Sequence, residues 1–65
     1  MAFINDEVPT GLINSSNKVF TLLNTPSQMV SVEMDGANYV NYVLVGNILT
    51  LTDAPTTSVY VDYFT

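Results

Sequence analysis

The side chains of this sequence that could do chemistry are six carboxylates, one lysine and four tyrosines. The acids form two close pairs and two single residues: Asp6 with Glu7, Glu33 with Asp35, Asp53, and Asp62. Paired carboxylates can act as general acid and base, or bind Ca²⁺ through oxygen. Here turn and outward strand positions explain the acids better, because Asp35 and Asp53 fall in turn or loop segments. We therefore predict no catalytic residue, no metal site and no cofactor.

The residue types that are absent exclude further classes of function. Without His or Cys, no Ser/His/Asp or Cys/His arrangement can form, and the usual zinc, haem and iron–sulfur ligands are missing. Lys18 is the only basic side chain in a chain of net charge −5. One lysine cannot neutralise several phosphates, so neither a nucleic acid nor an anionic membrane is an expected partner.

The N-terminal residues also bear on localisation. Met1-Ala2-Phe3-Ile4 runs directly into Asp6 and Glu7, without the basic start and long apolar run of a signal peptide. The longest apolar stretch, 42–45, is far shorter than the ~20 residues that span a bilayer. We expect a chain synthesised in the cytoplasm.

Many residues of the 65 are β-branched or aromatic, and no segment has helical periodicity. Asp35-Gly36 and Gly46-Asn47 are hairpin turn signals, and Asn14 to Asn17 is a further turn. The pattern predicts an all-β fold, a small antiparallel β-sandwich or barrel of five to six short strands. The expected strands are 10–13, 19–24, 29–34 with a return starting at 37–39, 42–45, 48–52 and 58–64. Residues 1–9 are expected to form an N-terminal arm, and 10–65 a single domain.

Alternation along these strands predicts the core. The inward candidates are Leu12, Phe20, Leu22, Val30, Val32, Tyr42, Leu44, Leu49, Leu51, Val59, Val61 and Tyr63. The opposite parity is also apolar in several strands, which favours a protein–protein contact over scattered surface residues. A domain of this size is marginal alone, so we expect a homo-oligomer or docking on a larger partner.

Short segments follow one another in a fixed order along residues 8–64: VPTGLINSSN, VFTL, TP, VSV, DG, YVLVGN, LTL, AP and VYVDY. This order resembles a small β-rich module of tailed-bacteriophage virion proteins. Departures from its pattern are Ser15 and Ser16 near a usual Gly, Asp35 for Asn, and Asn41 for Asp. The resemblance implies a structural role in a virion, in a capsid-associated, neck, tail or fibre position, and it carries no catalytic residues.

Together these observations predict a non-enzymatic virion protein, a minor or decorating component that binds other virion proteins in a larger capsid or tail lattice. The interface residues expected from the apolar second face and the arm are Phe3, Ile4, Val43, Val45, Ile48, Tyr60 and Phe64. Two alternatives stay open. One is a carbohydrate-binding module that contacts host glycans through Tyr39 or Tyr60, and the other is an acidic inhibitor that docks on a basic protein.

Overall fold

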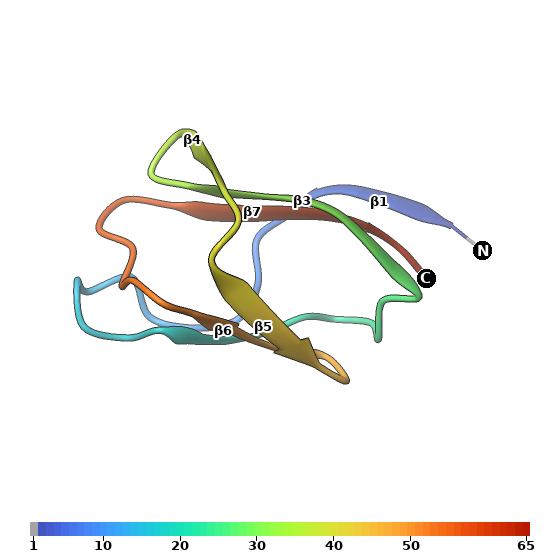
Figure 1. Cartoon of the computed structure of the whole chain (residues 1–65), viewed down its shortest axis with the longest axis horizontal. Helices are drawn as coiled ribbons and strands as arrows, with labels where there is room; N and C mark the ends of the chain where they lie inside the picture. The colour runs from blue at the N-terminus through green and yellow to red at the C-terminus, as the bar shows by residue number, and fades with distance from the viewer. Residues whose placement is uncertain (1) are drawn as a thin grey trace.

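The computed structural model describes residues 2–65, which form seven strands in two stacked antiparallel sheets (Figure 1). One sheet has the order β1-β7-β3-β4 and the other the order β2-β6-β5. The strands are β1 (Phe3–Glu7), β2 (Val19–Thr21), β3 (Gln28–Met34), β4 (Ala37–Tyr39), β5 (Tyr42–Val45), β6 (Ile48–Leu51) and β7 (Val59–Phe64). The predicted all-β fold, a small antiparallel sandwich, is confirmed, but residues 2–65 form seven strands rather than the predicted five to six.

The hydrophobic core lies between the two sheets. Alternation places one side of each regular strand inward. The fully buried apolar side chains are Phe20, Leu22, Val32, Leu49, Leu51, Val59, Val61 and Tyr63. All eight belong to the predicted core. Tyr42 and Leu44 pack against this cluster but are only partly buried, because β5 lies at the edge of its sheet.

Two tight turns set the register of the hairpins, as predicted. Asp35 and Gly36 join β3 to β4 with φ of 55° and 84°, the two positive values that a type I′ turn requires. Gly46 begins the β5–β6 turn with φ of 60°, and Val45 pairs with Ile48 across it. Glycine reaches these φ values without steric cost, which explains its place in both turns.

A bulge in β3 overturns the predicted inward position of Val30, which is half exposed. Met29 pairs with Tyr63 and Ser31 with the adjacent Asp62, so Val30 is an extra residue in the ladder. An inserted residue reverses the alternation on one side of the bulge. Met29 therefore packs against the core, whereas Val30 faces outward.

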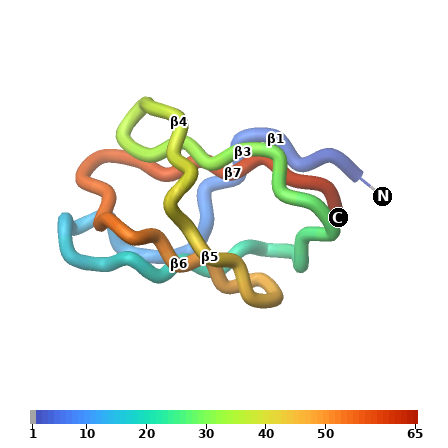
Figure 2. The backbone as a smooth tube through the Cα atoms, viewed as in Figure 1, coloured from blue at the N-terminus to red at the C-terminus, as the bar shows by residue number. Residues whose placement is uncertain are grey.

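The predicted N-terminal arm, residues 1–9, is instead a strand of the sandwich over part of its length, and Met1 lies outside the described residues. Phe3–Glu7 is strand β1 and pairs with β7 in antiparallel register. The backbone N–H of Thr65 donates to the carbonyl of Ala2 at 2.9 Å, so the two ends of the chain lie together (Figure 2). Period-two alternation is lost in β1 because a bulge before Glu7 places Asp6 at φ 53°.

Residues 10–13 do not form the predicted strand, and Leu12 is not a core residue. Only Thr10 makes a bridge, with two hydrogen bonds to Thr21 of 2.8 and 2.9 Å between backbone atoms. The side chain of Leu12 is 70% exposed. The segment instead touches the edge of β2 through this antiparallel bridge, and Gly11 lies against the ring of Phe20.

Replacement of Gly11 by alanine is expected to destabilise the domain by about 1–3 kcal/mol, the usual cost of overpacking a well-filled core. The new Cβ would clash with Cδ1 of Phe20 and lie 2.8 Å from Cε1 of the same ring and 3.0 Å from the carbonyl oxygen of Val19. Urea unfolding measures the effect. Leu12→Ala is the control and should change the free energy of unfolding by less than about 0.5 kcal/mol, since this side chain is exposed. A larger loss in the Leu12 variant would contradict this account of the segment.

Candidate protein-binding surface

The outer side of the three-stranded sheet is a continuous surface of β-branched residues. The register places Thr50 between Val19 and Val43, and Ile48 between Thr21 and Val45. We call these six residues the Val/Thr face. Val43 and Val45 are 64% and 71% exposed, and Val19 and Ile48 are also exposed. Apolar side chains so arranged form a patch rather than isolated surface residues.

Charge is segregated from the Val/Thr face. None of its six residues is ionisable, although the chain has a net charge of −5. Asp6, Glu33 and Asp62 lie on strands of the other sheet. Asp35 and Asp53 lie in turns. An uncharged apolar surface on an otherwise acidic molecule fits contact with another protein surface.

The predicted interface residues do not lie on one surface. Val43, Val45 and Ile48 belong to the Val/Thr face, whereas Tyr60 and Phe64 project from β7 in the opposite sheet. Val19, Thr21 and Thr50 were missed. Thr50 is two residues after Ile48 in β6, so strand alternation in the sequence already places both side chains on the same side of the sheet.

At the chain ends, Phe3 and Phe64 form an aromatic pair on the four-stranded sheet. Their ring centroids are 5.1 Å apart at an interplanar angle of 48°. Phe3 is half exposed, whereas Ile4 points inward and packs against the core. The contact between the rings of Phe3 and Phe64 holds β1 against β7, so these predicted interface residues have a role within the fold.

Three acids also meet on the four-stranded sheet. Oxygen atoms of Asp6, Glu33 and Asp62 lie within 4.8 Å of one another, a grouping that sequence proximity does not indicate. Both carboxylate oxygens of Asp62 accept hydrogen bonds. One accepts from the backbone N–H of Asp6 at 2.6 Å and the other from the hydroxyl of Ser31 at 2.8 Å. Asp62 therefore links β7 to β1 and to β3, which is a role within the fold.

Glu7 is a buried carboxylate that serves the core. It accepts a hydrogen bond from the backbone N–H of Leu23 at 2.9 Å and another from the hydroxyl of Tyr63. Burial, together with the bond to Glu7, raises the pKa of Tyr63 above its ordinary value. Because the neutral phenol is the favoured form, this contribution to stability is complete below about pH 10 and is lost as the pH rises through the raised pKa. The residue types admit acid–base chemistry, but both side chains are enclosed between the sheets.

Asp35 organises the loop that precedes β7. Its carboxylate accepts hydrogen bonds from the backbone N–H groups of Thr56, Thr57 and Ser58, at distances from 2.7 to 3.2 Å. The hydroxyls of both threonines donate to it as well. These donors, led by the N–H of Thr57, hold the pKa of Asp35 well below its usual range. Asp35 is therefore a structural residue, as its turn position predicts.

Asp35→Asn is expected to lower stability at neutral pH, because the amide cannot accept all the bonds made by the carboxylate. Asparagine still tolerates the positive φ at this position. A lowered pKa in the folded state stabilises the protein above the unfolded-state pKa of about 4. This contribution is lost as the pH falls toward the folded-state pKa. Thermal unfolding from pH 7 to 2 should show the difference between parent and variant shrinking below about pH 4, and a constant difference would contradict this role.

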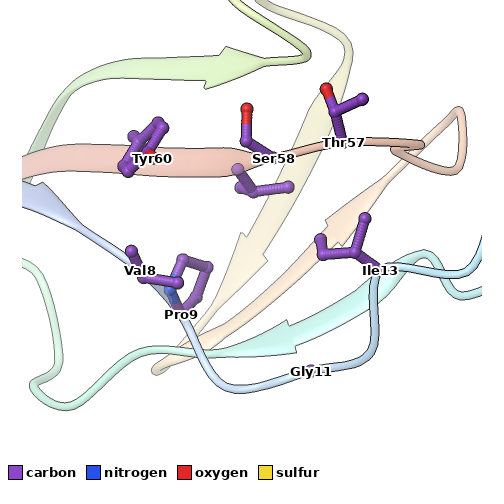
Figure 3. A pocket seen from close by; sticks show the side chains of 8 residues that line it. Val8, Pro9, Gly11, Ile13, Thr57, Ser58 and Tyr60 are labelled. Atoms are coloured by element: carbon purple, nitrogen blue, oxygen red, sulfur yellow. The ribbon is translucent and has the colours of Figure 1, made fainter.

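A small hollow lies between residues 8–13 and the start of β7. Val8, Pro9 and Ile13 line one side, and Thr57, Ser58 and Tyr60 line the other (Figure 3). Its volume is about 150 Å³, below the roughly 300–1,000 Å³ of typical small-molecule sites.

Tyr39, one of the two tyrosines proposed for glycan stacking, has its hydroxyl bonded to the N–H and the carboxylate of Asp53 at 2.9 Å. Tyr60 is 40% exposed.

Residues 2–65, the part of the chain that the structure describes, contain no helix long and apolar enough to cross a membrane. Of the surfaces described, the Val/Thr face is the one with both the extent and the uniform chemistry of a protein contact. Comparison with protein-family models, with curated proteins and with solved structures found no match to this chain.

Proposed function

We propose that this protein is a non-enzymatic structural module that docks on a larger protein assembly through its Val/Thr face. The observation that carries the proposal is the composition of that face, six β-branched residues without an ionisable group. Burial of apolar surface gains about 25 cal/mol per Å², and no charge on this face has to be desolvated.

The resemblance of residues 8–64 to a β-rich module of tailed-phage virion proteins supplies the setting of the proposal. In that setting the partner is a capsid or tail lattice, and the protein is a minor or decorating component of the virion. The chemistry of the face agrees with such a role, because the buried core of a protein–protein interface is depleted in charged residues.

Thr50→Lys tests the docking surface. Thr50 is exposed and lies at the centre of the Val/Thr face, so a lysine there places a charge in the contact and spares the core. Gln28→Lys is the matched control, since Gln28 is exposed on β3 in the opposite sheet. Both variants should fold, as judged by their thermal transitions.

Binding is measured by co-sedimentation with purified virions and capsids of the phage whose genome encodes the chain. The parent and Gln28→Lys should sediment with the particles, and Thr50→Lys should lose at least tenfold in affinity. Equal binding of both variants would show that another surface makes the contact. Absence of the protein from purified particles by mass spectrometry would contradict the virion setting itself.

A further inference from the structure

Within residues 2–65, three of the four sheet edges are protected against pairing with another chain, and β5 is the exception. Edge β1 has a bulge with the acid Asp6 at positive φ, and β4 has only three residues before the chain leaves for the other sheet. Edge β2 is capped by its bridge to Thr10. These are recognised devices against edge-to-edge association. Strand β5 (Tyr42–Val45) has no charge, proline or bulge.

The free hydrogen-bonding groups of β5 follow from its pairing with β6. Val45 and Ile48 close a two-residue hairpin, so Val45 and Val43 direct their backbone groups toward β6. Strand geometry then directs the N–H and C=O of Leu44 to the opposite side. The C=O of Tyr42 and the N–H of Gly46 lie on that same open side.

We propose that β5 pairs with β5 of a second copy of this chain, about a two-fold axis at Leu44, to give one continuous six-stranded sheet. Leu44 then exchanges two N–H···O=C bonds with Leu44 of the partner subunit. Each Gly46 N–H donates to the carbonyl of the partner's Tyr42. Antiparallel pairing of a strand with itself is self-complementary, as a two-fold interface requires.

The side chains of β5 support a second copy as the occupant. Tyr42 and Leu44 face the core but are partly exposed, whereas Leu49 and Leu51 on the neighbouring β6 are 0% and 1% exposed. A paired copy would continue the inner layer past Leu44 and cover it. On the outer side, Val43 would lie opposite the partner's Val45 and join the two Val/Thr faces into one surface. The dimer does not depend on the proposed docking function, since it uses the strand edge rather than the face.

The pairing is tested with two double variants that remove the same two valines. V43K/V45K places lysines opposite lysines in both cross-strand pairs and should be monomeric. V43K/V45E places lysine opposite glutamate in both pairs and should still dimerise. Repulsion between the net charges would favour the opposite result, because V43K/V45K has a net charge of −3 and V43K/V45E keeps the −5 of the parent. Both alter exposed side chains and should fold.

Sedimentation velocity between about 10 μM and 1 mM gives the dissociation constants. The parent and V43K/V45E should dimerise, V43K/V45K should bind itself at least tenfold more weakly, and the parent dimer should tighten with salt as repulsion is screened. Hydrogen exchange of the Leu44 and Gly46 amides should slow as the dimer forms. A parent that stays monomeric at 1 mM, or two double variants that behave alike, would overturn the pairing.

The variant Thr50→Lys separates this inference from the docking function. Thr50 is on the central strand β6, away from the β5 edge, so this variant should dimerise like the parent while losing its binding to particles. Loss of dimerisation in Thr50→Lys would place the dimer contact on the Val/Thr face and overturn edge pairing. Retained particle binding would count against the docking function alone.

Discussion

Deletion of residues 1–7 is expected to abolish the fold at 25 °C. These residues include β1, which pairs with one edge of β7 in the four-stranded sheet. The deletion removes Ile4 from the core and Glu7 from the hydroxyl of Tyr63 and the N–H of Leu23. Deletion of a detachable arm would leave the fold intact, so the experiment separates an integral strand from an appendage.

The expected size of the effect follows from the small stability of such a domain. A core in a chain of this length supplies about 3–5 kcal/mol. A buried donor left without its acceptor costs about 1–3 kcal/mol, and the partly buried Ile4 contributes a share of the roughly 1.5–3 kcal/mol of a fully buried aliphatic side chain. Far-UV circular dichroism and amide NMR spectra report the outcome. Deletion of Met1 and Ala2 alone should preserve a cooperative transition, and the same transition after deletion of 1–7 would contradict the account.

Glu7→Leu is expected to destabilise the domain by about 1–3 kcal/mol, because the buried hydroxyl of Tyr63 loses its acceptor and the partly buried N–H of Leu23 loses its own. Leucine is close to glutamate in size but accepts no hydrogen bond from Leu23 or Tyr63. Glu7→Gln keeps one acceptor oxygen and should lose less. Urea unfolding at pH 7 measures both variants, and equal losses would contradict the account, because the acceptor oxygen that glutamine keeps would then add no stability.

A double-mutant cycle of Glu7→Leu with Tyr63→Phe isolates the bond between the two side chains. Removing both partners leaves no unpaired phenol in the core, so the double variant should be more stable than the sum of the single effects predicts. The hydroxyl of Tyr63 also accepts from Asn24 at 3.3 Å, so Tyr63→Phe alone carries that additional loss. Strict additivity of the two substitutions would contradict a direct coupling.

The parts of the fold that could be predicted from sequence are the regular strands between strong turns. In β6 and β7, unbroken alternation gave the correct inward positions of the core residues, because a turn or loop precedes each strand and no residue is inserted within it. These core residues are Leu49, Leu51, Val59, Val61 and Tyr63. Val30 could not be placed, since a single inserted residue reverses the alternation and carries no residue-type signal. Leu12 was misplaced because an apolar run beside a turn resembles a short strand.

The candidate surface was only half predictable for a different reason. Alternation shows which side of its own strand Val43 or Tyr60 occupies, but it does not show which sheet that strand joins. The pairing of β7 with β1 and β3 joins distant parts of the chain and sends Tyr60 to the opposite outer surface. Glu7 was missed likewise, because its partners Leu23 and Tyr63 are distant in sequence.

Near-atomic imaging of intact virions of the phage type proposed above tests the central claim most directly. We predict that the outer surface of β2, β6 and β5 is covered by another protein, with Thr50 and Val43 inside the contact. The acidic surface formed by Asp6, Glu33 and Asp62 should remain in solvent. A particle in which the Val/Thr face points into solvent, or in which the protein is absent, would contradict the claim.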